Sequence, residues 1–330
     1  MKVFATGALG FIGRSLLERY RQAGAQVAGV DREADGELGV VAGDILKPGA
    51  WSERMRDADV IFHTAAVVSN VGDADDFWRV NVLGTRRVIE AAAGSGRFVH
   101  LSSTAAFGFD LPPQASETHP VRPNGNHYVD TKIASEQVVL QAHAAGELEC
   151  TIVRPADVYG PGSRPWTIVP VQMLRSRQFL LPASGRGVFS PVYIDNLVDG
   201  LVAAGETDAA AGQVFTVGDG VSLPARDFFG HYARMLGGAP IWTLPTPLAA
   251  GAGGLVGAGS RLVGKPSEAS AQTMRMLARN GGYSIEKARR VLGYEPKVDL
   301  EEGMRRTERW LVDQGMIDAK QPASRDRRPG

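Results

Sequence analysis

The stretch that decides the fold reads Val3-Phe4-Ala5-Thr6-Gly7-Ala8-Leu9-Gly10-Phe11-Ile12-Gly13. A short apolar run, which predicts a strand, leads directly into glycines at intervals of three, and a helical pattern follows them. Glycines at such a junction permit a tight turn, let backbone amides approach a pyrophosphate and let the helix pack closely on the strand. The start of the helix also offers a favourable dipole to an anion. The stretch therefore predicts the first strand, turn and helix of a dinucleotide-binding domain.

The same alternation of strand and helix continues through the first half of the chain. Runs that predict strands cover residues 3–6, 26–31, 39–43, 60–64, 97–102 and 150–154. Helical patterns cover residues 14–23, 75–93 and 128–145, and later 227–236 and 300–314. Strands that alternate with helices are typical of βαβ units in a parallel sheet. We therefore predict an α/β fold, a doubly wound parallel sheet of the Rossmann type with a smaller, irregular C-terminal substrate-binding region.

Composition narrows the class of protein. The chain has 36 Lys and Arg residues against 36 Asp and Glu residues, so it lacks the basic excess that nucleic-acid binding needs. Its one cysteine, Cys150, stands in an apolar run, where a small buried core residue is expected. The sequence begins directly with a predicted strand and shows no signal-peptide pattern, so we expect a cytoplasmic protein. We expect no nucleic-acid partner, no membrane span and no metal site.

An acidic residue completes the dinucleotide pattern. Asp31 ends the second expected strand, at the interval beyond the glycines where a carboxylate accepts hydrogen bonds from the adenosine ribose. A carboxylate there repels a 2′-phosphate, so NAD is favoured over NADP, although the neighbouring Arg32 could partly accept a phosphate. Asp44 and Ile45 follow the third strand and could contact the adenine, with an N-cap role as the alternative for Asp44. His63 is expected to be a packed core residue without chemistry.

Candidate catalytic residues follow in the next part of the chain. Tyr128 and Lys132 stand four residues apart in a strongly helical segment, so both lie on one face of the helix. A tyrosine with an ordinary pKa of about 10 needs a neighbouring cation to act as a base near neutrality, and Lys132 supplies it. The hydroxyls of Ser102, Ser103 and Thr104 follow the fifth strand, where one of them can hold the substrate oxygen. The glycine turn, the hydroxyl and the Tyr/Lys pair together are far more specific than each alone.

Over nearly its full length the chain resembles the extended short-chain dehydrogenase/reductase family, the NAD-dependent epimerase/dehydratase superfamily. The matching motifs are Thr6-Gly7-x-x-Gly10-x-x-Gly13, Asp31, Asp44-Ile45, His63-x-Ala65-Ala66, Asn81-Val82-x-Gly84-Thr85, Ser102-Ser103, Phe107-Gly108, Tyr128-x-x-x-Lys132, Arg154-Pro155, Val158-Tyr159-Gly160-Pro161 and Tyr193-Ile194-Asp195-Asn196. Counted back from Gly108, the family's catalytic Ser/Thr falls on Ser103. The resemblance therefore implies Ser103, Tyr128 and Lys132 as catalytic residues.

The resemblance also implies ligands, a division of the chain and a partner. NAD is the expected cofactor, bound by Gly7, Leu9, Gly10, Phe11, Ile12, Asp31, Arg32, Asp44, Ile45, Thr64, Ala65, Ala66, Asn81, Ser102, Tyr128, Lys132, Pro155 and Val158. The expected substrate residues are Ser103, Thr104, Tyr128, Ala156 and Phe189. Residues 1–155, with parts of 190–217, form the expected NAD-binding Rossmann domain, residues 156–189 and 218–317 the substrate-binding region, and residues 318–330 a disordered tail. A homodimer through helices 75–93 and 128–145 is the expected assembly.

One position bears on the choice of substrate. Nucleotide-sugar enzymes of this superfamily usually carry an arginine where this chain has Phe189, although Arg186 could substitute from nearby. The form Tyr193-Ile194-Asp195-Asn196-Leu197 resembles the 3β-hydroxysteroid dehydrogenase-like branch. The uncharged stretch at residues 236–260 is expected to be mobile and, between residues 249 and 259, partly disordered. Its portion at 241–256 would form an apolar lid, with a plain packing helix as the alternative.

We therefore arrive at three functional hypotheses. The first is NAD-dependent hydride transfer at a secondary alcohol or ketone, with a hydrophobic, hydroxysteroid-like substrate. The second is a nucleotide-sugar epimerase or dehydratase in which NAD stays tightly bound. The third is a redox-inactive NAD-binding regulatory protein, which would not need to keep Ser103, Tyr128 and Lys132 together.

Overall fold

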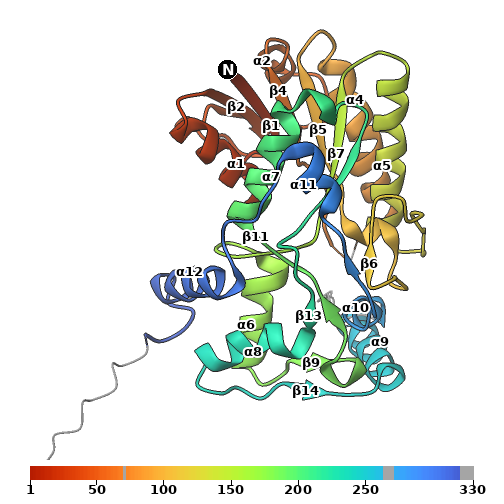
Figure 1. Ribbon diagram of the computed structural model, residues 1–330, viewed down its shortest axis with the longest axis vertical. Helices are drawn as coiled ribbons and strands as arrows, with labels where there is room; N and C mark the ends of the chain where they lie inside the picture. The colour runs from red at the N-terminus through yellow and green to blue at the C-terminus, as the bar shows by residue number, and fades with distance from the viewer. Residues whose placement is uncertain (70–71, 263–270, 320–330) are drawn as a thin grey trace, which may run out of the picture.

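The structure is a computed structural model that describes residues 1–69, 72–262 and 271–319 (Figure 1). From residue 320 onward, the tail expected at residues 318–330 lies outside the described residues. Among the described residues, no helix combines the length and the apolar character that crossing a membrane requires.

A seven-stranded sheet in the order β12-β7-β5-β4-β1-β2-β3 forms the centre of the molecule. Its strands are β1 (Lys2–Thr6), β2 (Gln26–Asp31), β3 (Val40–Ala42), β4 (Val60–His63), β5 (Arg97–Leu101), β7 (Cys150–Pro155) and β12 (Val214–Val217). Every neighbouring pair is parallel. From β1 the chain first adds β2 and β3 on one side and then β4, β5, β7 and β12 on the other, so the sheet is doubly wound. In sheets of this kind, ligands bind at the carboxyl ends of the strands. The predicted fold class is confirmed, with β12 as a strand beyond the six expected.

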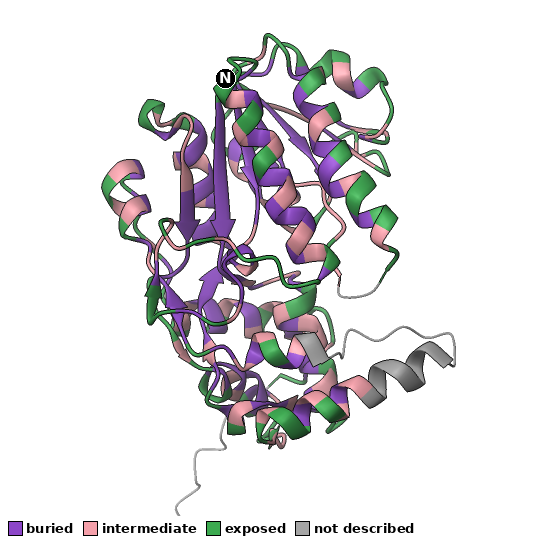
Figure 2. Cartoon of the chain, turned by 90° about the vertical axis from the view of Figure 1, so that its right-hand side faces the viewer, coloured by how far each residue is buried: buried purple, intermediate pink, exposed green. Residues whose placement is uncertain are grey.

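Two hydrophobic cores lie on opposite faces of this sheet. The side chains of β1 alternate between them, so that Val3 and Ala5 belong to one core and Phe4 to the other. The first core includes side chains of α1 (Phe11–Gln22) and α7 (Ile194–Glu206), and the second those of α2 (Ala50–Met55), α4 (Gly84–Ala91) and α5 (His127–Ala144). Figure 2 shows the sheet strands buried between these layers. Burial on both faces explains why the strands read as continuous apolar runs.

The single helix expected at residues 75–93 is divided in three. Its parts are α3 (Ala74–Phe77), the π-helical turn η1 (Trp78–Leu83) and α4. A π-helical turn often marks a functional site, because the wider turn displaces side chains from their regular positions. Trp78 and Leu83 are exposed on this segment. The homodimer expected through it stays a prediction.

Short paired strands and further helices complete the molecule, and most of them lie below the sheet in Figure 1, whereas α11 (Glu286–Leu292) packs against β12 and α7. The strands pair as β8 (Asp157–Tyr159) with β11 (Pro191–Tyr193), β9 (Leu180–Leu181) with β14 (Trp242–Thr243), β10 (Val188–Phe189) with β13 (Leu223–Pro224), and β6 (Gln114–Ala115) with β15 (Gly282–Tyr283). The helices are α6 (Val169–Arg175), α8 (Ala225–Met235), α9 (Thr246–Leu262), α10 (Ala271–Leu277), α11 (Glu286–Leu292) and α12 (Leu300–Asp313). Shorter helical turns are η2 (Thr104–Phe107), η3 (Arg164–Ile168), η4 (Ala183–Gly185) and η5 (Asp208–Ala210).

The expectation of partial disorder between residues 249 and 259, within the stretch at 236–260 expected to be mobile, was wrong because these residues lie in α9. This helix covers Thr246–Leu262 and packs against α10. Pro247 suits the first turn of a helix, where its missing amide hydrogen costs nothing, and the alanines that follow are strong helix formers. Ala249 is fully buried. The alternative of a packing helix therefore describes the backbone better than a mobile segment does.

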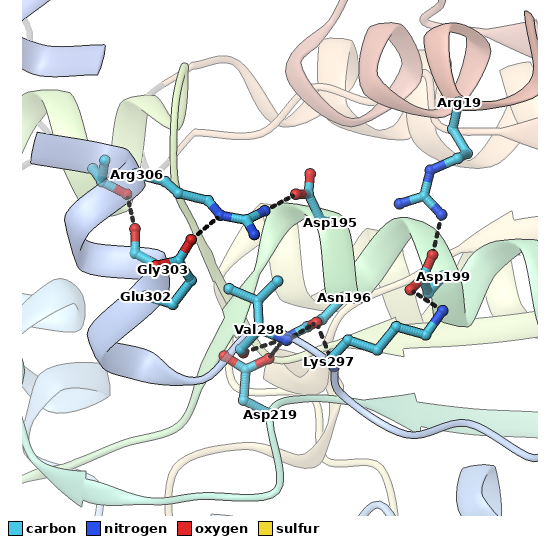
Figure 3. Close-up of polar contacts among 11 residues, drawn as sticks. Arg19, Asp195, Asn196, Asp199, Asp219, Lys297, Val298, Glu302, Gly303 and Arg306 are labelled. Carbon is cyan, nitrogen blue, oxygen red and sulfur yellow. Dashed lines mark hydrogen bonds and ion pairs between the residues drawn. The ribbon is translucent and has the colours of Figure 1, made fainter. Parts of the chain in front are cut away.

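Asn196, on α7, connects Asp219, which follows β12, to the segment around Lys297 and Val298 (Figure 3). Its side-chain nitrogen donates to the Asp219 carboxylate at 2.7 Å and to the Val298 carbonyl at 2.8 Å. Its oxygen accepts from the backbone amides of Lys297 and Val298, both at 3.0 Å. Burial raises the pKa of Asp219 to about 7, although the hydrogen bond from Asn196 opposes that rise. Asn196, the last residue of the Tyr193-to-Asn196 motif, therefore anchors the segment around Lys297 and Val298.

Candidate active site

The glycine turn at the end of β1 leaves no room for side chains. Gly7 has a φ of 65°, and a Cβ on it would lie 2.7 Å from the Ala65 nitrogen. A Cβ on Gly13 would lie 2.2 Å from the Gly7 carbonyl oxygen. The N-cap residue of α1 is Gly10, which has no side chain to bond the backbone amides of the first turn. These amides therefore remain available to a ligand. This cradle fits a pyrophosphate at the start of α1.

Asp31 lies beside this turn at the end of β2. Its carboxylate accepts the Leu9 amide at 2.8 Å through Oδ2 and the Arg32 amide at 2.7 Å through Oδ1. These bonds orient the carboxylate, and each oxygen keeps a lone pair for a ribose hydroxyl. The Arg32 side chain is exposed. The structure therefore brings the predicted acid and the glycine turn together.

The other residues expected to bind the cofactor differ in how far they are buried. Asp44 is exposed and accepts the Leu46 amide at 2.9 Å in a local turn. The next helix in the described chain, α2, has Gly49 as its N-cap, so the alternative N-cap role of Asp44 was wrong. Ile45 is buried, whereas Thr64, Ala65, Ala66, Phe11, Ile12 and Val158 are partly buried. The Thr64 hydroxyl donates to the Thr6 carbonyl at 2.7 Å, which places the end of β4 against the glycine turn. Pro155 is the last residue of β7. Their contacts with a cofactor stay predictions.

Replacing Asp31 with alanine is expected to weaken NAD binding more than NADP binding. A hydrogen bond to a charged group contributes about 1.5–3 kcal/mol, so NAD affinity should fall roughly 10- to 150-fold. NADP should lose less, because the same change removes the repulsion of its 2′-phosphate. Titration calorimetry with both nucleotides measures the ratio, and Glu33→Ala, on the exposed residue two positions later, serves as the control. An unchanged NAD to NADP ratio would remove the argument for Asp31 as the selective residue.

Asn81 connects the cofactor side of the sheet to the catalytic helix. It is buried in the π-helical turn, where its Oδ1 accepts the Val67 amide at 2.8 Å. Its Nδ2 donates to the Val67 carbonyl at 3.2 Å and to the Thr131 hydroxyl at 3.0 Å. Thr131 lies between Tyr128 and Lys132 on α5, so Asn81 fixes the backbone after β4 against the helix that carries both.

His63 is a core residue with both ring nitrogens bonded. Nδ1 lies 2.7 Å from the Thr6 hydroxyl and Nε2 2.9 Å from the Thr85 hydroxyl. Because the Thr85 hydroxyl donates to the Asn81 carbonyl at 2.7 Å, it must accept from Nε2–H. Burial lowers the pKa of His63 to about 3, and the nearby Lys132 adds to that effect. A neutral, fixed imidazole agrees with the expectation that His63 has no acid–base role.

Ser103, Tyr128 and Lys132 converge at the carboxyl end of β5. The Tyr128 side chain lies beside Ser103, and burial raises the pKa of Tyr128 while the Ser103 hydroxyl lowers it. Lys132 is buried, and its ammonium donates to the Leu101 carbonyl at 2.7 Å. Burial lowers the pKa of Lys132 to about 8. The arrangement places a phenol, a hydroxyl and a cation where a proton can be moved at one oxygen.

Two further residues near this group had no role assigned from the sequence, although Arg154 was part of a matching motif. Glu136 and Arg154 form a buried ion pair, with Nε 2.8 Å from Oε1 and Nη2 2.6 Å from Oε2. Ser102 donates its hydroxyl to Glu136. Glu136 follows Lys132 by four residues, and this continued spacing was the signal that could have identified it.

The expected substrate residues are buried to different degrees. Thr104 is buried beside Tyr283, and Ala156 is buried after the end of β7. Phe189 is fully buried, with its ring centroid 4.1 Å from that of Phe228 and 5.0 Å from that of Trp166. Phe189 thus belongs to an aromatic core, and its contact with substrate stays a prediction.

Cationic groups near Phe189 are either paired or exposed. Arg279 lies 5.8 Å from the Phe189 ring, and it is buried in an ion pair with Asp157. Arg186, expected as a substitute for the missing arginine, is exposed. A diphosphate would therefore meet no unpaired buried arginine among these described side chains.

The sequence of the chain matches a family model and the sequences of known enzymes. Residues 3–218 match the model of the NAD dependent epimerase/dehydratase family. The chain is 30% identical over 319 residues to 4-hydroxy-2-methyl-3-oxo-4-farnesyl-3,4-dihydroquinoline-1-oxide ketoreductase of Stigmatella aurantiaca, covering 92% of this chain and 95% of the relative. It is 32% identical over 336 residues to UDP-glucose 4-epimerase of Mycolicibacterium smegmatis, covering 93% of this chain and 97% of the relative.

A solved structure shows the same fold. MoeE5 in complex with UDP-glucose and NAD aligns with a TM-score of 0.77 at 24% identity, covering 95% of this chain and 99% of that chain. At this identity the likeness establishes the fold and leaves the substrate open.

Proposed function

The chain belongs to the NAD-dependent epimerase/dehydratase family, and on this premise we propose that it transfers a hydride reversibly between NAD and a hydrophobic secondary alcohol or ketone. The observation that carries the proposal is the convergence of Ser103, Tyr128 and Lys132 at the end of β5. A redox-inactive regulatory protein of the same fold would need the glycine turn to bind NAD, but it would not need these three side chains together.

NAD is the cofactor of this family, and the residues present fit it. The glycine turn would hold the pyrophosphate, and Asp31 would bind the adenosine ribose. Lys132 would bind the nicotinamide ribose hydroxyls in place of the Leu101 carbonyl. When bound, NAD supplies the acceptor or donor of the hydride.

The chain's own residues handle the proton. In the reducing direction, the Tyr128 hydroxyl donates its proton to the substrate oxygen as that oxygen gains charge. The Lys132 ammonium stabilises the resulting phenolate, because an opposite charge nearby favours the ionised form. The Ser103 hydroxyl donates a hydrogen bond to the same oxygen and orients it. In the oxidising direction the proton returns to Tyr128.

The nature of the substrate is inferred from the surroundings of Phe189. The position at which sugar-nucleotide enzymes usually carry an arginine holds an apolar ring packed among aromatic residues. The buried guanidinium of Arg279, 5.8 Å from the centre of the Phe189 ring, is already paired with Asp157. A neutral, hydrophobic alcohol or ketone suits such surroundings better than a diphosphate. The ketoreductase from Stigmatella aurantiaca is a relative whose name describes reduction of a ketone.

A nucleotide-sugar epimerase or dehydratase is the second candidate. The exposed Arg186 favours it, because this cation lies three residues before Phe189 and is free to turn toward a phosphate. The relative named UDP-glucose 4-epimerase supports it equally. In that case the hydride would return to the substrate and no reduced cofactor would accumulate.

A substrate panel separates the two candidates. Purified protein is mixed with NAD and hydroxysteroids, aryl alcohols, hydroxy acids or UDP-sugars, and the absorbance of reduced cofactor is followed at about 340 nm. We expect net reduction of NAD with a neutral, hydrophobic alcohol. Chromatography of the UDP-sugars serves as the second readout. Sugar interconversion without net reduction of NAD would reverse the ranking.

A further inference from the structure

Three side chains of α5 contact three consecutive residues at the end of β5. Tyr128 lies beside Ser103, Lys132 donates to the Leu101 carbonyl, and Glu136 accepts from Ser102. The three helical residues are four positions apart, so they form one continuous row on the face that meets the sheet. The catalytic pair is thus part of a longer row, and Glu136 is the member to which the proposed chemistry gives no role.

Glu136 holds the residues on both sides of Ser103. Its carboxylate accepts the Ser102 hydroxyl and binds Arg154 through two hydrogen bonds. The Arg154 guanidinium lies 4.6 Å from the centre of the Phe107 ring, at the end of the turn that Ser103 caps. Ser102 and Phe107 therefore attach to one buried ion pair. Because this pair connects α5, β5 and β7, it fixes the Ser103 backbone relative to the Tyr128 helix.

Glu136 also places a negative charge near the catalytic cation. The titratable and charged groups around Lys132 are Tyr128 and Glu136 on α5, His63 on β4, His100 on β5 and Arg154 on β7. Burial lowers the pKa values of both histidines, with a further contribution from Lys132, so they carry no charge near neutrality. Burial also lowers the pKa of Lys132, and Glu136 opposes that effect. Within this group of described residues, Glu136 is the anion that favours the ammonium.

We propose that Glu136, held by Arg154, is a positioning residue that fixes Ser103 against Tyr128 and supplies the negative charge beside Lys132. This inference rests on the proposed function, because the positioned residues are those assigned to proton transfer. Glu136 itself touches neither the substrate oxygen nor the nicotinamide in this proposal. It acts through Ser102, Lys132 and Arg154.

The charge part of the proposal can be tested without any substrate. The protein is labelled with ¹³C at lysine Cε, and the Lys132 signal is identified by its loss in Lys132→Met. In the presence of NAD, Glu136→Gln should shift the Lys132 titration to lower pH by about 0.5–1 pH unit. Glu90→Gln is the matched control, because it removes one exposed carboxylate from α4, where Glu90 pairs with Arg86 and Arg87. It should leave the Lys132 titration unchanged.

A second variant covers the case in which Glu136→Gln does not fold. Glu136→Leu combined with Arg154→Met removes both charges, and replacing a buried ion pair by apolar residues usually preserves the fold. The double variant should shift the Lys132 titration less than Glu136→Gln does, because the cation is lost together with the anion. Lys132 titrating as in the wild type in Glu136→Gln would overturn the charge assignment. If only the double variant folds, a shift of its Lys132 titration to higher pH would overturn it, because the lost cation would then outweigh the lost anion.

The positioning part is tested with the substrate that the panel identifies. Glu136→Asp keeps the charge but shortens the side chain, so turnover should fall about 10- to 100-fold while KM changes little. Its Lys132 titration should stay near that of the wild type. Wild-type turnover in Glu136→Asp would overturn the positioning role. If the panel yields no substrate, the proposed function fails, while the Lys132 titration still decides whether Glu136 controls the cation.

Discussion

Replacing Tyr128 with phenylalanine is expected to reduce turnover by roughly 10²- to 10⁴-fold, the usual contribution of a positioned acid or base. The change removes the hydroxyl that gives its proton to the substrate oxygen and keeps the ring that packs beside Ser103. NAD affinity should stay within about twofold, because Lys132 and the glycine turn are untouched. Steady-state kinetics and a nucleotide titration on the same preparation separate the two effects.

Tyr159→Phe provides the matched control. The Tyr159 ring is fully buried, and its hydroxyl has no hydrogen-bond partner among the described residues. Removal of that hydroxyl therefore costs no hydrogen bond, and turnover should stay near that of the wild type. If Tyr128→Phe kept its turnover while Tyr159→Phe lost it, the assignment of the proton to Tyr128 would be wrong.

Replacing Gly13 with alanine is expected to weaken NAD binding and to lower the stability of the fold. The added Cβ would lie 2.2 Å from the Gly7 carbonyl oxygen, so the glycine turn must move away from α1. Overpacking of this kind costs about 1–3 kcal/mol, which corresponds to roughly 5- to 150-fold in affinity if the displaced turn no longer fits the pyrophosphate. Calorimetry measures the affinity, and circular dichroism measures the unfolding midpoint.

Gly36→Ala is the control for this substitution. Gly36 is exposed, and no atom lies within 4 Å of where its Cβ would stand. The change should leave both NAD affinity and stability near their wild-type values. NAD affinity in Gly13→Ala equal to that in Gly36→Ala would contradict the role of the glycine turn.

The central sheet could be predicted from the sequence because burial on both faces makes its strands distinct apolar runs. β12 was missed because Val214–Val217 is a run of only four residues, and its partner β7 lies some sixty residues earlier in the chain. No local pattern identifies such a partner. The short pair of β6 with β15 joins residues even farther apart in the chain and was equally invisible.

Helical segments were harder to predict where packing overrides local preference. The glycines of α9 predict a flexible stretch, yet the helix forms where it packs against α10. The π-helical turn within residues 74–91 could not be distinguished from a regular helix, because the apolar spacing of the segment is close to that of an α-helix. Propensity alone does not reveal a single widened turn.

The candidate site could be predicted where chemistry and spacing coincide. Tyr128 and Lys132 were identified from a spacing of four residues, and Ser103 from the family motif. Glu136 continues the same spacing but was missed, because a glutamate on a helix usually faces solvent. Its burial depends on Arg154, which lies on a strand 18 residues later. A pairing between distant elements is what the sequence alone does not reveal.

Transfer of deuterium from the nicotinamide tests the central claim most directly. The wild-type protein and Tyr128→Phe are each supplied with NADH that carries deuterium at C4 on either face and with a neutral ketone from the panel. Mass spectrometry of the product alcohol then measures the label at the carbinol carbon. We predict one deuterium per product from one of the two labelled faces with the wild type, and almost no product with Tyr128→Phe. Reduction that proceeds equally well in both proteins, or no reduction of any ketone alongside conversion of a UDP-sugar, would contradict the account.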